Sequence, residues 1–212
     1  MGRGRYEEAR RLLLEAHRLD PCYAYIQLNL SSLEANEGRR DESLAWTEDA
    51  LRCQPRLSLA HYYHARALER VGRADEALDE YRNTTAIDDQ HADSWQSQGR
   101  LLEERAAWAE AAAAYDRALA VDPSDAQAAM LAGLVYHYHL DDSARAVDRY
   151  RAVLRLKPHH YGAHYQLAVA LLGSGHREAA EVAWREFVAM ADAIGDRQSI
   201  ESAPLLLRVS MR

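Results

Sequence analysis

The stretch "WAEAAAAYDRALAVDPSDA" (108–126) places an alanine-rich run with helical spacing directly before an Asp-Pro pair. Similar stretches occur elsewhere in the chain as "YEEARRLLLEAHRLDPCYA" (6–24), "ADEALDEYRNTTAIDDQHA" (74–92) and "SARAVDRYRAVLRLKPHHY" (143–161). Such recurrence indicates that one structural unit is used several times, and the spacing between the copies predicts the fold.

The turn residues that close these stretches recur at a fixed interval. Pro21 and Pro55 are 34 residues apart, and the same step leads to Asp89 and then to Pro123. Pro158 follows after 35 residues, which predicts one extra residue within "HYHLDD" (137–142). Each period holds two apolar stripes with helical spacing on either side of a short break. A period near 34 with this pattern is typical of stacked helical hairpins.

The pattern resembles the tetratricopeptide repeat, whose motif combines a large aromatic residue, Leu-Gly, Tyr, Ala, an aromatic residue, Ala and Pro at fixed offsets. The residues that match it best are Trp95, Gly99, Leu102, Ala111, Tyr115, Ala118 and Pro123, followed in the next period by Gly133, Tyr136, Ala146, Tyr150 and Pro158. The match extends over about residues 4–192. The resemblance implies an all-α fold, a right-handed superhelical solenoid of antiparallel helix pairs.

This register predicts the helices and the repeats. We expect helices over 5–19, 23–36, 40–53, 57–70, 74–87, 91–104, 108–121, 125–138, 142–156, 160–173 and 176–193. Residues 1–22 are expected to hold half a repeat, its second helix alone, and residues 23–194 five repeats, at about 23–56, 57–90, 91–124, 125–159 and 160–194. Gly195 is expected to end the last repeat helix. Residues 195–212 are expected to form a capping helix, through Leu205, Leu206, Val209 and Met211, or a linker.

Composition and charge exclude several classes of function. The net charge of −7 argues against a general nucleic-acid or anionic-membrane surface. The N-terminus lacks an apolar signal region and no apolar run approaches the length of a membrane span, so we expect no membrane insertion and a cytoplasmic location. Lys157 is the single lysine among many arginines, which is typical of a GC-rich, bacterial genome.

The sequence carries no pattern that points to catalysis or to metal binding. It lacks a GxSxG motif, a P-loop and a nucleotide fingerprint, so we expect no enzyme and no cofactor. His61 and His164 occupy the position of Trp95 in the repeat, so packing explains them and no metal site is expected. Cys22 and Cys53 form no CxxC pair, and their separation of 31 residues predicts that they lie on successive repeats, beyond disulfide reach.

The candidate binding residues follow from the family resemblance. Tetratricopeptide proteins bind a peptide or protein segment along a concave face lined by the first helix of each repeat. Carried over by register, this face holds Tyr25, Asn29, Tyr62, Tyr63, Arg66, Arg70, Gln96, Arg100, Met130, Leu134, Tyr138 and Tyr165. Arginine and tyrosine near the middle are favoured anchors for an acidic or carboxylate group, and the C-terminal half is more apolar. A purely structural alternative is that Arg66 pairs with Glu69 or Asp93 and that Leu134 is ordinary packing.

These observations predict a protein-binding scaffold or adaptor. The family's clamp for the C-terminal carboxylate of chaperones is not expected, because Leu59 and Tyr63 stand where it needs Lys and Arg. Two alternatives stay open. In the first, the chain is the recognition arm of a larger enzyme or of a secretion or assembly complex. In the second, it is a self-assembling scaffold. In the second case a homo-oligomer would form through the open N-terminal edge at Ala9, Leu12 and Leu13.

Overall fold

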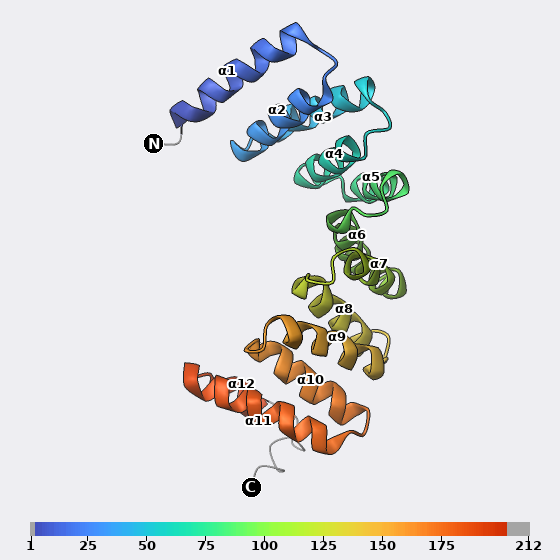
Figure 1. The fold of residues 1–212 in the computed structure, drawn as a ribbon, viewed down its shortest axis with the longest axis vertical. Helices are drawn as coiled ribbons and strands as arrows, with labels where there is room; N and C mark the ends of the chain where they lie inside the picture. Colours follow the sequence, from blue (N-terminus) through green and yellow to red (C-terminus); the bar gives the residue numbers. More distant parts are fainter. Residues whose placement is uncertain (1–2, 203–212) are drawn as a thin grey trace. The chain divides into compact units, whose positions relative to one another are not determined.

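The computed structural model describes residues 3–202, and this part of the chain consists of helices joined by short turns, without a strand (Figure 1). The helices are α1 (Arg3–Leu19), α2 (Ala24–Asn36), α3 (Arg40–Cys53), α4 (Ser58–Arg70), α5 (Ala74–Ile87), α6 (Ala92–Glu104), α7 (Trp108–Val121), α8 (Ala126–Tyr138), α9 (Ser143–Leu156), α10 (Tyr161–Gly173), α11 (Arg177–Ile194) and α12 (Arg197–Ser202). The predicted all-α class is confirmed. The proposed capping residues Leu205, Leu206, Val209 and Met211 lie outside the described residues.

The helix bounds follow the sequence register closely. Most predicted ends agree with the observed ends to within one residue, because the turns recur at the same place in each repeat. The connection between α8 and α9 spans residues 139–142, whereas the equivalent turns span 37–39, 71–73, 105–107 and 174–176. The extra residue predicted within 137–142 is therefore confirmed. Gly195 caps α11 in the left-handed conformation, with φ 77°, as expected.

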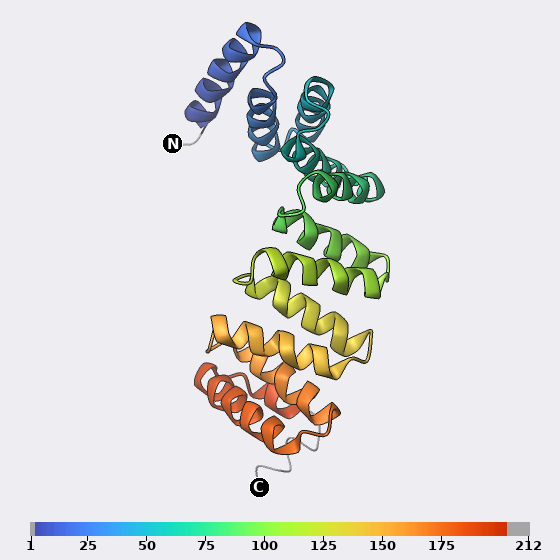
Figure 2. The same cartoon turned by 45° about the vertical axis from the view of Figure 1, so that its right-hand side comes forward.

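The chain divides into two compact units, residues 1–101 and 102–212, and the boundary falls inside α6. In the first unit α1 packs on α2, α2 and α3 form an antiparallel pair, and so do α4 and α5 (Figures 1 and 2). The first helices α2 and α4 are also neighbours. In the second unit α8 pairs with α9 and α10 with α11, and α8 lies beside α10. The right-handed superhelix expected for the whole array stays a prediction.

Small residues allow the paired helices to approach closely. Gly133 of α8 faces the ring of Tyr150 of α9, and a Cβ at position 133 would lie 2.6 Å from Tyr150 Cε1. Tyr150 itself is fully buried, so a shift of its ring would disturb the packing around it. Glycine at position 133 therefore allows α9 to approach α8 closely.

The turn inside each repeat passes through the left-handed region of the backbone. Gly72 has φ 83° at this position, and the equivalent residue of the next repeat is Ala106, with φ 55°. Alanine in this region costs roughly 1 kcal/mol more than glycine, because its Cβ approaches the backbone. The register of the fold is thus kept even where the sequence does not supply the favoured residue.

Candidate protein-binding site

Three of the predicted binding residues form one cluster on α4. The rings of Tyr62 and Tyr63 meet edge to face, with centroids 5.6 Å apart. The guanidinium carbon of Arg66 lies 5.5 Å from the centroid of Tyr62 and 6.0 Å from that of Tyr63. The rings therefore hold the cation by cation–π attraction and limit its conformational freedom. All three side chains are partly exposed.

Arg70 adds a second cation one helical turn beyond Arg66. Among the described residues, no carboxylate lies within ion-pair distance of Arg66 or Arg70, so the predicted alternative in which Arg66 pairs with Glu69 or Asp93 is not formed. Burial and the neighbouring charge of Arg66 lower the pKa of Arg70. The two arginines therefore create an excess of positive charge on α4. We call Tyr62, Tyr63, Arg66 and Arg70 the α4 cluster.

Arg100 of α6 forms an ion pair with Glu69 of α4. Glu69 also accepts a hydrogen bond from the hydroxyl of Tyr81, at 2.5 Å. Burial raises the pKa of Tyr81 to about 12, so the hydroxyl stays protonated and donates a hydrogen bond to the carboxylate. Glu69 thus satisfies Arg100, which has less capacity for a new anion than Arg66 or Arg70.

The other predicted residues of the first unit surround the α4 cluster less closely. Tyr25 and Asn29 are exposed on α2, the neighbour of α4, and the ring of Tyr25 lies 5.6 Å from that of Tyr23. Gln96 is partly buried on α6. The ring of His91 contacts that of Tyr62 in a tilted arrangement, with centroids 4.5 Å apart and an angle of 46° between the ring planes. The sequence analysis did not select Tyr23 or His91, because both precede a helix and fall outside the carried-over positions.

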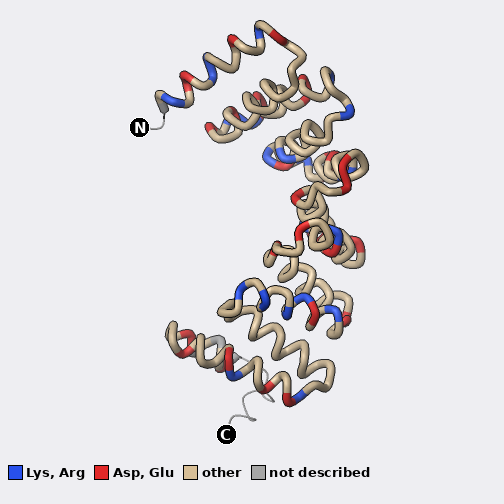
Figure 3. Tube along the Cα trace, viewed as in Figure 1, with Lys and Arg blue, Asp and Glu red and all other residues tan. Residues whose placement is uncertain are grey.

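The predicted residues of the second unit lie on α8 and α10. These two helices contain no Asp, Glu, Lys or Arg (Figure 3). Tyr138 is 53% exposed, and its hydroxyl donates to Gln166 Oε1 at 2.7 Å. Tyr165 packs against Phe187 of α11, with centroids 5.2 Å apart. Tyr138 is thus the accessible aromatic of this group, while Tyr165 also serves the core.

Met130 and Leu134 are partly buried on the same helix, α8. Met130 packs against a cluster of buried residues made of Ala126, Ala129, Val153 and Ala163. Its side chain therefore contributes to the core of the second unit as well as to the uncharged surface. The two groups of predicted residues, one in each unit, differ in chemistry, since the first is cationic and the second apolar.

The histidines at the aromatic position of the repeat are structural, as their register predicts. His61 Nε2 donates to the carbonyl of Pro55 at 3.0 Å, and His164 Nε2 to that of Pro158 at 2.9 Å. Trp95 Nε1 makes the same bond with Asp89, at 2.9 Å. Each side chain thereby ties the start of a repeat to the preceding turn. No group of three or more His, Cys, Asp or Glu residues in the described part of the chain could hold a metal ion.

The N-terminal helix leaves apolar side chains in contact with water. Leu12 is 52% exposed, whereas Ala9 and Leu13 are partly buried. Arg10 fixes α1 on α2 through an ion pair with Glu34, at 3.0 Å. Association of two copies through this edge stays a prediction. In the described residues, 3–202, no helix has the length and apolar character needed to cross a membrane.

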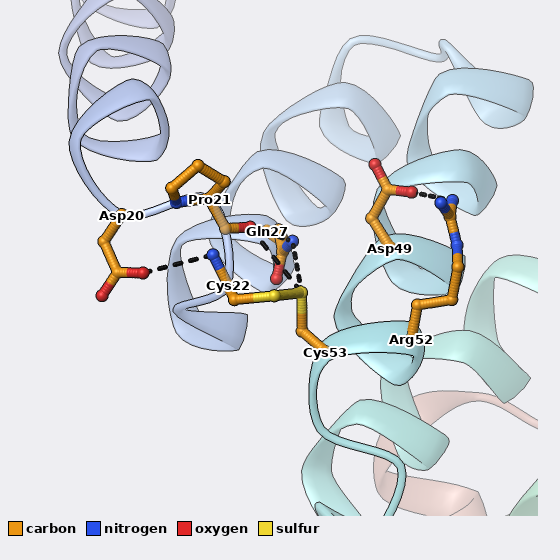
Figure 4. Close-up of a disulfide and its surroundings, with 7 residues drawn as sticks. All are labelled: Asp20, Pro21, Cys22, Gln27, Asp49, Arg52 and Cys53. Carbon is orange, nitrogen blue, oxygen red and sulfur yellow. Dashed lines mark hydrogen bonds and ion pairs between the residues drawn. A yellow bond between two sulfur atoms is a disulfide. The ribbon is translucent and has the colours of Figure 1, made fainter.

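The prediction for the cysteines is wrong. Cys22 and Cys53 form a disulfide, with their Cα atoms 5.2 Å apart (Figure 4). The prediction treated 31 residues of sequence as a distance in space. Because α2 and α3 are antiparallel, the end of α3 returns to the start of α2, where Cys22 lies. Both residues are therefore at the same end of one helix pair.

Comparisons with known proteins identify similar folds among solved structures. No curated protein matches this sequence. Among solved structures, YrrB, described as a TPR protein with an unusual peptide-binding site, has a TM-score of 0.72 at 18% identity over 84% of this chain and 91% of its own. MamA (residues 41 to the end) from Desulfovibrio magneticus RS-1 has a TM-score of 0.66 at 18% identity, over 80% and 96%. The C-terminal part of a TPR repeat-containing protein from Cytophaga hutchinsonii has a TM-score of 0.75 at 16% identity, over 90% and 76%.

At these identities the structures establish the fold, and the family follows from the sequence itself. The family model of the tetratricopeptide repeat matches residues 1–58, 97–140 and 136–186, which is well over half of the chain. The chain therefore belongs to the tetratricopeptide repeat family.

Proposed function

We propose that this protein is an interaction scaffold whose α4 cluster binds an acidic or carboxylate-bearing segment of another protein. The observation that carries the proposal is the pair Arg66 and Arg70, which have no carboxylate partner among the described residues. An arginine fork matches a carboxylate with two parallel hydrogen bonds, so one acidic group could engage either side chain.

The geometry of the α4 cluster favours binding over simple exposure. The guanidinium of Arg66 is held over the rings of Tyr62 and Tyr63, so part of its conformational entropy is already lost before a partner arrives. The two rings add apolar area beside the charge. The net charge of the whole chain is −7, so this cationic site is local and favours a short acidic segment over a nucleic acid.

The uncharged surface of α8 and α10 supports a second contact of different chemistry. Its exposed aromatic, Tyr138, and the partly buried Met130 and Leu134 suit an apolar side chain of a bound segment. The fold that this chain shares with YrrB, described as having an unusual peptide-binding site, supports the same class of function. The cationic and apolar groups are two separate elements of the proposal, and each is testable by itself.

The proposal is tested by selecting peptides from a displayed random library on immobilised protein. Wild type is expected to enrich segments rich in Asp and Glu or ending in a free carboxylate. The double variant Arg66→Gln/Arg70→Gln is expected to lose this enrichment while its helix content and thermal unfolding stay those of wild type. The matched control is Arg151→Gln/Arg155→Gln, which removes two exposed arginines one turn apart on α9. Enrichment of acidic peptides that survives in the α4 variant would refute the assignment.

A further inference from the structure

The cysteine pair lies outside the α4 cluster, and the proposed function does not use it. Cys22 lies in the turn between α1 and α2, and Cys53 is the last residue of α3 (Figure 4). Their disulfide closes a ring that contains the whole of α2 and α3. The bond therefore encloses the first complete helix pair of the array.

The surroundings of the bond show that it is accessible from water. Cys22 is exposed and Cys53 is partly buried. The backbone N–H of Cys22 donates to Asp20 Oδ1 at 3.2 Å, and Gln27 Nε2 donates to the carbonyl of Pro21 at 2.9 Å. These hydrogen bonds fix the turn that presents Cys22 to Cys53. Solvent-exposed disulfides are in general the ones that exchange readily with external thiols.

We propose that Cys22 and Cys53 form a redox-controlled staple that sets the local stability of the α2–α3 pair. In the oxidised form the bond removes conformations from the open state of this pair, so that α2 and α3 separate less often. In the reduced form the pair depends on its helix contacts alone. A repeat array is stabilised mainly by contacts between neighbours, so the effect stays close to α2 and α3.

The chemistry of opening is ordinary thiol–disulfide exchange. The thiolate of a small-molecule thiol attacks the sulfur of the exposed residue Cys22, the S–S bond breaks, and Cys53 leaves as a thiolate that takes up a proton. The thiolate of a second small-molecule thiol then attacks the small molecule's sulfur in the mixed disulfide, which releases Cys22 as a thiolate that takes up a proton, together with the small-molecule disulfide. The protein gains two electrons and two protons, and two external thiols are oxidised to one disulfide.

The state of the Cys22–Cys53 bond depends on the compartment in which the protein resides. Disulfides persist in oxidising compartments and are rare in a cytosol that keeps thiols reduced. The staple is therefore closed in an oxidising environment and open in the cytoplasm expected from the sequence. The α2–α3 pair would be stabilised by the disulfide in oxidising surroundings and would be held by its helix contacts alone in reducing surroundings.

The test combines thiol trapping with hydrogen exchange. The full chain is equilibrated in glutathione buffers of increasing oxidised fraction, alkylated with iodoacetamide and weighed by mass spectrometry. We expect conversion between a doubly alkylated and an unalkylated form within this range. Amides of α2 and α3 should exchange more slowly in the oxidised form, by a factor on the order of 100, whereas amides of α8–α11 should not change.

The Cys22→Ser/Cys53→Ser variant is the matched control, and it should reproduce the reduced wild type in every buffer. Two free thiols, or two mixed disulfides with glutathione, in the most oxidising buffer would overturn the pairing. An intramolecular bond that leaves the exchange of α2 and α3 unchanged would overturn the role as a staple. Single variants, Cys22→Ser and Cys53→Ser, give the same readout if the double variant folds poorly.

Discussion

Three tyrosines occupy the same register position but differ in what their hydroxyls contact. Tyr81 donates to Glu69 at 2.5 Å, and Tyr115 donates to Glu103 at 3.1 Å. Tyr150 is equally buried, but its hydroxyl has no hydrogen-bond partner. In the register of the repeat, the position of Glu69 and Glu103 falls on His137, because this repeat has one extra residue between α8 and α9. Replacing each tyrosine by phenylalanine removes one hydroxyl and keeps the ring.

The structure predicts that these substitutions change the free energy of unfolding in opposite directions. A hydrogen bond to a charged group contributes roughly 1.5–3 kcal/mol, so Tyr81→Phe should destabilise by about 2 kcal/mol. Tyr115→Phe should cost about 1 kcal/mol, because its bond is longer. A buried hydroxyl without a partner costs about 1–3 kcal/mol, so Tyr150→Phe should be neutral or should stabilise by about 1 kcal/mol. Burial also raises the pKa of Tyr150, so ionisation does not relieve the hydroxyl.

Thermal unfolding followed by circular dichroism measures the three variants side by side. For a chain of this size 1 kcal/mol corresponds to roughly 2–4 °C in the unfolding midpoint. We therefore expect Tyr81→Phe and Tyr115→Phe to melt below wild type, and Tyr150→Phe to melt at or above it. A loss for Tyr150→Phe as large as that for Tyr81→Phe would show that the Tyr150 hydroxyl has a partner, and the reasoning would fail.

Three further substitutions test the packing, the turns and the pH dependence. Gly133→Ala should lower the unfolding free energy by roughly 1–2 kcal/mol in a urea titration, because the Cβ would lie 2.6 Å from Tyr150 Cε1 and the overlap outweighs the helix propensity of alanine. Ala106→Gly should raise the free energy of unfolding by about 1 kcal/mol, and with it the melting temperature, because glycine tolerates the φ of 55° at this position. An unchanged or lower midpoint would contradict this. Burial lowers the pKa of His64, so its contribution to stability is fully present above the ordinary pKa of histidine and is lost as the pH falls toward the folded-state value. Between pH 7.5 and pH 5 the midpoint of thermal unfolding should therefore decrease more for wild type than for His64→Leu. An equal decrease in both proteins would argue against this effect.

The regular part of the fold is predictable because one period repeats through the chain. Proline and aspartate mark the turns, so the helix ends and even the extra residue between α8 and α9 follow from counting. The histidines at the aromatic position follow in the same way, since the hydrogen bond of His61 to Pro55 repeats that of Trp95 to Asp89. Features that repeat are thus fixed by local sequence.

The features that were missed depend on how side chains meet across helices. Register places both Arg66 and Arg100 on the candidate face, but the reach of the side chains decides that Arg100 takes Glu69 and leaves Arg66 over its tyrosines. A glutamate 12 residues before the repeat tyrosine, seen at Glu69 and Glu103, is a signal that could have identified the tyrosine–glutamate hydrogen bonds. The disulfide was missed because an antiparallel pair brings distant residues to one end.

If Arg66 and Arg70 recognise an acidic group, the two arginines and the acidic residues of a bound peptide contribute jointly to affinity, and a double-mutant cycle measures this coupling. The affinity of one selected acidic peptide is measured by fluorescence anisotropy for wild type and for Arg66→Gln/Arg70→Gln. Both measurements are repeated with the peptide's acidic residues changed to their amides. We expect the losses from the two changes to be non-additive, with a coupling of about 1–3 kcal/mol, and we expect Arg151→Gln/Arg155→Gln to show no coupling. Additive losses would mean that the acidic group contacts another part of the protein, and the assignment of the α4 cluster would be wrong.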